Sequence, residues 1–124
     1  MKHWFRNNKE KGTFYEKKAL LFLQSQKLKL ITKNYHSRSG EIDIVMLDNN
    51  ILVFVEVRFR SNKGFGGGLE SIDFHKQNKI KKTAAIFLQK HKQYQDANCR
   101  FDVVSLAKNQ KNDDTIDWIQ SAFE

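Results

Sequence analysis

The stretch GEIDIVMLDNNILVFVEVRFR, residues 40–60, decides the fold that this sequence predicts. Apolar and charged residues alternate at its start, and a β-branched and aromatic run follows, so the pattern indicates two strands. Asp48, Asn49 and Asn50 lie between the two runs, and asparagine tolerates the positive φ that a tight turn needs. We therefore expect an antiparallel hairpin in the middle of the chain.

The length of this turn fixes which side chains face one another across the hairpin. A two-residue loop places Asp43 opposite Glu56 on one face of the sheet. Glu41 and Arg58 then form the next pair on that face. A three-residue loop would separate the two carboxylates onto opposite faces. The other face of the second strand is entirely apolar, and we expect it to lie in the core.

Facing carboxylates on Asp43 and Glu56 repel one another, and the repulsion grows when they are partly buried. A divalent cation would remove this cost, and the hard cations Mg²⁺ and Mn²⁺ prefer carboxylate oxygen. The alternative is an ordinary surface pattern, with an ion pair between Glu41 and Arg58 and a solvated Asp43. Charge spacing alone leaves both interpretations open.

Length and composition restrict the class of protein. The 124 residues suffice for one domain, residues 1–124, with a core of its own. The first residues lack the apolar run of a signal peptide, and no segment is apolar over the ~18 residues that span a membrane. The single cysteine, Cys99, cannot form an internal disulfide, so we expect a cytoplasmic protein with no membrane partner.

The net charge of +8 is concentrated near the N-terminus. Residues 1–40 carry ten Lys and Arg against two acidic residues, whereas residues 41–124 carry twelve of each kind. A basic surface favours a polyanion as the partner, with nucleic acid first and an anionic membrane second. A basic protein that is merely soluble is the alternative.

The chain as a whole predicts the element order helix, three strands, helix, two strands. We expect a flexible basic arm over residues 1–11 and a second helix from its N-cap Asp73 to about His91. Outside the hairpin, strands are expected over residues 30–36, 100–107 and 115–123. This order predicts an α/β sandwich, a mixed sheet of about five strands flanked by helices, because a helical crossover favours parallel pairing.

Glu16 has two interpretations in the first helix. Thr13 and Glu16 match a capping box, which would place both residues at the start of that helix. Alternatively the helix begins earlier and Glu16 points toward the sheet as a further acid of the site. Lys17 and Lys18 would then fall on the outer side of the helix.

Residues 61–69 carry four of the six glycines in the chain. No Lys-Ser or Lys-Thr pair follows in the spacing of a nucleotide-binding P-loop, so we expect a mobile loop beside Arg58 and Arg60. This loop either closes over a substrate backbone or simply connects two elements. Lys76 lies in the first turn of the following helix, nearest to the loop.

A set of short motifs points to a known family. The chain resembles the bacterial YraN family of endonuclease-like proteins, which have the PD-(D/E)xK nuclease fold and are similar to archaeal Holliday junction resolvases. The motifs that carry the resemblance are Tyr15-Glu16-x-x-Ala19, Asn34, Gly40-Glu41-Ile42-Asp43, Phe54-Val55-Glu56-Val57-Arg58, Lys76, Ala84, Arg100-Phe101-Asp102-Val103-Val104 and Ala122-Phe123. They extend over nearly the whole chain, and they imply a restriction-endonuclease-like sandwich.

The resemblance implies a role for each acidic residue of these motifs. Asp43 and Glu56 would hold Mg²⁺ or Mn²⁺, and Glu16 would be the helix-borne catalytic acid. Glu41 belongs to the family motif and would be either structural or an outer metal contact. A metal held by carboxylates lowers the pKa of bound water and polarises phosphoryl oxygens, which suits the hydrolysis of a phosphodiester.

Arg58 departs from the family pattern, because it stands in the place of the usual catalytic lysine. Arginine stays charged and cannot transfer a proton, but it can clamp a phosphate with two hydrogen bonds and stabilise developing negative charge. Lys76 is the candidate replacement for the missing lysine. The substitution also leaves open that catalysis is lost and only binding remains.

The leading functional prediction is an Mg²⁺- or Mn²⁺-dependent endodeoxyribonuclease that acts on structured or branched DNA, and the resemblance implies a homodimer. The alternatives are a catalytically inactive DNA-binding module that keeps the nuclease fold, and an interaction protein with no nucleic-acid role. The residues expected to contact DNA are Lys17, Lys18, Arg38, Arg60, Lys63, Lys76 and Lys79.

Overall fold

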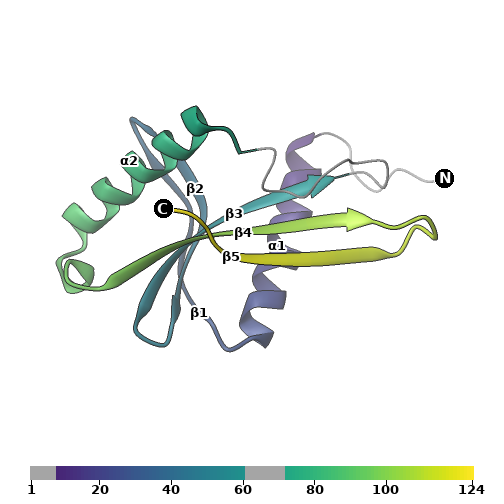
Figure 1. The fold of residues 1–124 in the computed structure, drawn as a ribbon, viewed down its shortest axis with the longest axis horizontal. Coiled ribbons are helices and arrows are strands. Elements are labelled where there is room, and N and C mark those ends of the chain that lie inside the picture. Colours follow the sequence, from purple (N-terminus) through teal and green to yellow (C-terminus); the bar gives the residue numbers. More distant parts are fainter. Residues whose placement is uncertain (1–7, 61–71) are drawn as a thin grey trace.

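The computed structural model describes residues 8–60 and 72–124, and it has the predicted order of elements (Figure 1). The elements are helix α1 (Asn8–Ser25), strands β1 (Lys29–Ser37), β2 (Gly40–Asp48) and β3 (Ile51–Arg60), helix α2 (Phe74–Lys90), the 3₁₀ helix η2 (Lys92–Tyr94), and strands β4 (Asn98–Lys108) and β5 (Asp114–Phe123).

The five strands form one mixed sheet in the order β1-β2-β3-β4-β5. Neighbouring strands are antiparallel except for β3 and β4, which are parallel. Helix α2 connects these two parallel strands, as expected for a helical crossover. The structure therefore confirms the predicted α/β fold and its mixed sheet flanked by helices, an arrangement consistent with a nuclease-like sandwich.

The two helices cover opposite faces of the sheet, which Figure 1 shows as three layers. Val53 and Val55 of β3 lie in one core cluster with residues of α1. Leu52 and Phe54 lie in the other cluster, together with Phe87 of α2. Because β3 is buried on both faces, its sequence is an almost continuous apolar run until Glu56.

The hairpin between β2 and β3 has the two-residue turn on which the predicted register depends. Asp48 pairs with Ile51, and the antiparallel ladder continues to the pair Ile44 and Val55. Asn49 in the turn has a φ of +55°, the left-handed conformation that asparagine tolerates. The ladder ends just before Asp43 and Glu56, so the two strands diverge where the acidic side chains begin.

The beginning of α1 differs from one prediction. The helix starts at Asn8, so the expected arm over residues 1–11 is wrong for its last four positions, and residues 1–7 lie outside the described part of the chain. The hydroxyl of Thr13 donates to the carbonyl of Lys9 (3.0 Å), inside the helix. The capping box is therefore wrong, and Glu16 lies near the middle of α1.

The beginning of α2 matches its prediction. The side chain of Asp73 caps the helix by accepting a hydrogen bond from the backbone N–H of Lys76 (2.8 Å). The predicted glycine-rich loop over residues 61–69 lies outside the described residues. Within the described chain, no helix combines the length and the apolar character that crossing a membrane requires.

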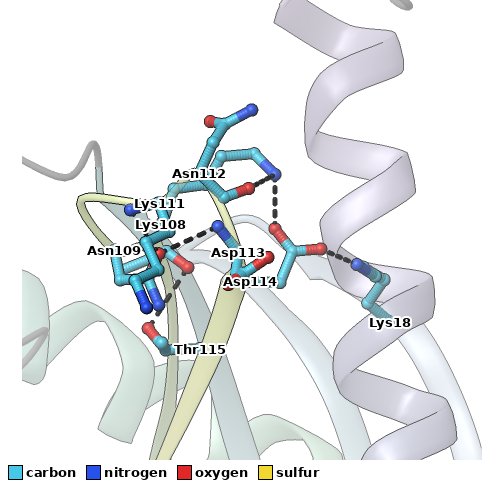
Figure 2. Close-up of polar contacts among 9 residues, drawn as sticks. Lys18, Lys108, Asn109, Lys111, Asn112, Asp113, Asp114 and Thr115 are labelled. Atoms are coloured by element: carbon cyan, nitrogen blue, oxygen red, sulfur yellow. Dashed lines mark hydrogen bonds and ion pairs between the residues drawn. The ribbon is translucent and has the colours of Figure 1, made fainter.

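The turn between β4 and β5 is attached to α1 through charged side chains (Figure 2). The carboxylate of Asp114 accepts a hydrogen bond from Lys108 Nζ (2.6 Å) and forms an ion pair with Lys18 of α1. Lys108 and Lys18 both lower the pKa of Asp114. The turn itself is closed by Asn109, whose side-chain oxygen accepts from the backbone N–H of Asp113 (2.9 Å).

Candidate functional site

A cavity of about 420 Å³ lies between α1, α2 and the diverging ends of β2 and β3. All five residues that the sequence predicts as catalytic line it: Glu16, Asp43, Glu56, Arg58 and Lys76. They come from four different elements, so only the tertiary fold brings them together. A concave site with several convergent charged groups is the usual form of an active or binding site.

Asp43 is placed by the end of the β2–β3 ladder. Its carboxylate accepts a hydrogen bond from the backbone N–H of Val57 (2.8 Å), a donor that the diverging strand no longer pairs. The strand also rotates here, because Ile42 packs in the core cluster of α2 whereas Ile44 packs in that of α1. Residues two apart in a regular strand share a face, so Asp43 lies at an irregularity in β2.

Glu56 is buried in the wall of the cavity, with only 5% of its surface exposed. Burial and the neighbouring Asp43 carboxylate raise the pKa of Glu56 to about 8, and Lys76 and Arg58 oppose the rise. Burial also raises the pKa of Asp43, against the hydrogen bond from Val57. Both shifts have the sign expected for two carboxyl groups held together away from water.

Glu16 is directed toward this cavity by the packing of α1. The helix buries Tyr15 and Ala19 against the sheet, and the ring of Tyr15 stacks on Phe59 of β3 with 4.0 Å between ring centroids. Glu16 follows Tyr15 and is half-buried at the cavity. Burial and the carboxylate of Asp43 raise the pKa of Glu16 to about 7. Of the two interpretations of Glu16, the structure supports the acid that points toward the sheet.

Two buried side-chain polar atoms lack a hydrogen-bond partner in the part of the chain that the structure describes: Glu56 Oε2 and Arg58 Nε. Buried polar atoms in folded proteins are almost always paired with protein or water. One of these atoms is an acceptor and the other is a donor, and both belong to residues that line the same cavity. A ligand in the cavity could therefore satisfy both atoms, with a positive centre at the oxygen of Glu56 and a negative centre at the nitrogen of Arg58.

The oxygen ligands at the cavity fit a hard divalent cation. Asp43 and Glu56 supply carboxylates of raised pKa, and Mg²⁺ in proteins is commonly held by one or two carboxylates with water and substrate phosphates completing its shell. Over residues 8–60 and 72–124, no group of three or more His, Cys, Asp or Glu side chains is arranged to hold a metal.

Glu41, predicted as a metal ligand or an outer contact, lines the cavity but has another partner. Its carboxylate lies 3.3 Å from His36 Nδ1, and the two residues pair across β1 and β2. Its side-chain contact in the described chain is thus with His36, an ion pair only when the imidazole is protonated, whereas the surface-pattern alternative expected an ion pair with Arg58. The Glu41 carboxylate is about half exposed, at 53%.

The residues predicted to contact DNA lie in different surroundings. Lys76 and Lys79 of α2 line the cavity. Arg38 is exposed in the turn between β1 and β2, and Lys17 is exposed on α1. Arg60 is the last residue of β3 and is half-buried. Of these five cations, only Lys76 and Lys79 are among the residues that line the cavity.

Lys18 differs from the other predicted DNA contacts, because its ammonium pairs with Asp114 (Figure 2). Its charge is therefore offset in part by this carboxylate, which Lys108 shares. Lys63 lies outside the described residues. Sequence reasoning missed Lys11, which lines the cavity and lies over the ring of Phe59, 4.5 Å from its centroid. No spacing signal distinguished it from the other lysines near the N-terminus.

Comparison with known proteins finds the same family by two routes. A model of the uncharacterised protein family UPF0102 matches residues 15–106. A UPF0102 protein of Pseudomonas syringae pv. syringae is 46% identical over 106 residues, which cover 86% of this chain and 86% of that protein. A UPF0102 protein of Alcanivorax borkumensis is 40% identical over 118 residues, 95% of this chain and 94% of its own.

Proposed function

Because the chain belongs to the uncharacterised protein family UPF0102, whose name records no activity, we propose its function from the site: metal-dependent hydrolysis of phosphodiester bonds in structured or branched DNA. The observation that carries the proposal is the convergence of Asp43 and Glu56 in a cavity that also holds Arg58 and Lys76. The family match confirms the resemblance to the YraN family, and that resemblance is the source of the preference for branched DNA.

Asp43 and Glu56 are the residues proposed to hold Mg²⁺ or Mn²⁺. When bound, such an ion lowers the pKa of water and polarises phosphoryl oxygens. The cation also relieves the repulsion between the two carboxylates, whose pKa values are raised by burial and by their proximity. The Oε2 atom of Glu56 is buried and has no hydrogen-bond partner within the described part of the chain, which supports this assignment.

Arg58 is proposed to bind the phosphate that is cleaved. Its Nε is a buried donor that has no partner among residues 8–60 and 72–124, and a guanidinium donates in a fork that matches two phosphate oxygens. Lys76 adds a second positive charge from the first turn of α2. Together they stabilise the negative charge that develops on the phosphate during hydrolysis.

Glu16 is proposed to exchange the proton of the attacking water. Its pKa of about 7 is close to the value at which a carboxylate is an efficient base near neutral pH. Arg58 cannot take this role, because a guanidinium stays protonated. Glu16 is therefore the proton acceptor that the described residues supply in place of the usual lysine.

Isothermal calorimetry followed by a cleavage assay tests the proposal. Mn²⁺ is titrated into the wild type, into Asp43→Asn/Glu56→Gln and into the control Asp117→Asn, which alters an exposed acid on β5. We expect the site variant to lose more than about 10-fold in metal affinity and the control to keep it. A labelled four-way DNA junction is then added with Mg²⁺ or Mn²⁺, and we expect cleavage by the wild type and the control only.

A second candidate function is supported by the arginine at position 58. A DNA-binding module that has lost catalysis would keep the fold and the cations but would not need the lysine that the family pattern lacks here. It predicts salt-dependent binding of the junction without a metal requirement and without cleavage. A homodimer, implied by the resemblance, stays a prediction that light scattering on the purified chain tests.

A further inference from the structure

Asn34 is a non-glycine residue with a left-handed backbone inside strand β1, with a φ of +53°. Such a conformation is uncommon within a strand, and asparagine is among the few residues that tolerate it. The ladder between β1 and β2 pairs Lys33 with Ile44 and Tyr35 with Ile42. Asn34 therefore lies at the level of Asp43, where that ladder has no pair.

The strand opposite Asn34 is irregular at the same level. Ile42 packs in the core cluster of α2, and Ile44 packs in that of α1. Since these residues are two apart, the backbone of β2 rotates at Asp43 between them. The left-handed residue of β1 and the rotation of β2 thus coincide at one point of the sheet.

The side chain of Asn34 lies beside a different acid of the site, Glu16 on α1. Burial and Asp43 raise the pKa of Glu16, and the amide of Asn34 opposes this rise, so the amide favours the ionised carboxylate. Asn34 and Glu16 also line a second, smaller cavity of about 70 Å³ with Lys17 and Lys33. Glu16 therefore separates this cavity from the main one.

We propose that Asn34 is a positioning residue of the candidate site: its left-handed backbone permits β2 to rotate at Asp43, and its side-chain amide holds the carboxylate of Glu16 toward the main cavity. One residue of β1 then sets the direction of two acids on two other elements. The catalytic consequence rests on the proposed function, whereas the contact between Asn34 and Glu16 does not.

Three substitutions separate the backbone role from the side-chain role. Asn34→Gly keeps the left-handed conformation and removes the amide. Asn34→Asp keeps the size and places a second negative charge against Glu16. Asn34→Ala removes the amide and disfavours the conformation as well. We expect the urea midpoint of Asn34→Ala to lie below that of Asn34→Gly, and the reverse order would overturn the backbone part of the proposal.

Nuclear magnetic resonance tests the side-chain part without any need for activity. The side-chain amide signals of Asn34 in ¹⁵N-labelled protein are assigned by their absence in Asn34→Gly. We expect these signals to shift in Glu16→Gln and to stay unchanged in Lys18→Gln, a change on α1 at a residue that pairs with Asp114 and does not line the smaller cavity. Signals that do not respond to Glu16→Gln would overturn the contact.

Steady-state cleavage of the four-way junction tests the consequence for catalysis. We expect kcat of Asn34→Gly to fall by about 10- to 100-fold with KM nearly unchanged, which is the loss typical of residues that orient a ligand or a catalytic group. A wild-type kcat in Asn34→Gly would overturn the positioning role. Absence of cleavage by the wild type would contradict the proposed function, and the resonance experiment would still decide the contact.

Discussion

Single residues at the cavity show how burial changes the chemistry of carboxyl groups. Glu56 has almost no exposed surface, one of its oxygens has no hydrogen-bond partner among the residues that the structure describes, and its pKa is raised to about 8. Glu16 lies nearer to the surface, and its pKa is raised to about 7. The two acids come from different elements, and their shared neighbour Asp43 contributes to both shifts. Because Asp43 is shared, we expect the substitution of one acid to change the titration of the others.

Glu56 makes the stability of the metal-free protein depend on pH. Its pKa is raised from 4.5 to about 8 in the folded chain, so between these values the folded state binds more protons than the unfolded state. The free energy of unfolding therefore falls as the pH rises through this window. In Glu56→Gln we expect the fall between pH 5 and pH 8.5 to be smaller by on the order of 2 kcal/mol.

Urea unfolding in EDTA at several pH values measures this difference. Asp117→Asn is the control, since its carboxylate is exposed on β5 and its curve should follow the wild type. Equal pH dependence in the wild type and in Glu56→Gln would contradict the raised pKa. Addition of Mn²⁺ at pH 8.5 should restore stability to the wild type and not to the variant, because only the wild type keeps both carboxylates.

At the scale of elements, a hydroxyl contact joins the β1–β2 turn to α2 beside the cavity. Ser37 donates its hydroxyl to Thr83 Oγ1 (3.2 Å), and Thr83 donates to the carbonyl of Lys79 (2.9 Å). Gly40 begins β2 at this contact with a φ of +146°, a conformation that side chains rarely adopt. The close approach of turn and helix keeps Gly40 and Lys79 at the same wall of the cavity.

Two glycine substitutions should change stability in opposite directions. The Cβ of Gly40→Ala would lie 3.4 Å from Thr83 Oγ1, and the backbone conformation would be strained, so we expect a loss of about 1–3 kcal/mol. Gly12 lies inside α1 with no atom within 4 Å of an added Cβ, so Gly12→Ala should gain about 1 kcal/mol. Urea unfolding measures the free energy of unfolding of both variants. An unchanged free energy of unfolding in Gly40→Ala would show that the turn relaxes without cost and would contradict the prediction.

A buried carboxylate on β4, that of Asp102, joins this strand to β5 at the edge of the sheet. Asp102 is fully buried, and it accepts from Arg100 Nε (2.9 Å), Trp118 Nε1 (2.9 Å) and the backbone N–H of Ser121 (3.0 Å). Arg100 also reaches Asp48 at the end of β2 (3.0 Å). The motif residues around Asp102 therefore fit a structural role, and none of residues 100–104 lines the cavity.

Removal of this carboxylate should destabilise the fold strongly. Asp102→Ala leaves the guanidinium of Arg100 without its main partner and two further donors unpaired, and we expect a loss of about 3–5 kcal/mol. Asp117→Ala on the exposed side of β5 is the comparison and should cost less than about 0.5 kcal/mol. Thermal or urea unfolding measures the stability of the two variants. Similar stabilities of Asp102→Ala and Asp117→Ala would contradict the structural role of Asp102.

For the whole molecule, the three-layer arrangement places the cavity where both helices and the diverging hairpin meet. The cations around it come from α1, β3 and α2, whereas the net charge of residues 41–124 is zero. The fold thus gathers basic side chains from both parts of the chain at one place. A polyanion approaching the cavity would meet several of them at once.

The salt dependence of DNA binding tests whether the basic side chains at the cavity contact DNA. Each phosphate contact contributes about 0.9 to the slope of log affinity against log salt concentration, so Lys76→Gln/Lys79→Gln should reduce the slope by about 2. Lys18→Gln is the matched control, because its ammonium already pairs with Asp114 and its loss should leave the slope nearly unchanged. Fluorescence anisotropy with a labelled junction measures the slopes. Equal slopes in the double variant and the wild type would place the DNA elsewhere.

Much of the fold was readable from the sequence, because the signals are local. Apolar alternation, the Asn49 turn and the Asp73 cap each act over a few residues, and they predicted the order of elements and the register of the hairpin. The register in turn placed Asp43 near Glu56, since a side-chain period of two leaves no freedom once the turn length is known. These parts of the candidate site needed no knowledge of the remaining chain.

Other parts depended on contacts between distant segments. The direction of Glu16 follows from the packing of its neighbour Tyr15 on Phe59, far away in the sequence. The ion pair of Lys18 depends on where the β4–β5 turn lies. Asn34 shows the difference most clearly. Its identity permitted a left-handed conformation, but only the sheet and α1 placed it opposite Asp43 and against Glu16, because helix position and strand pairing are set by the burial of the whole core.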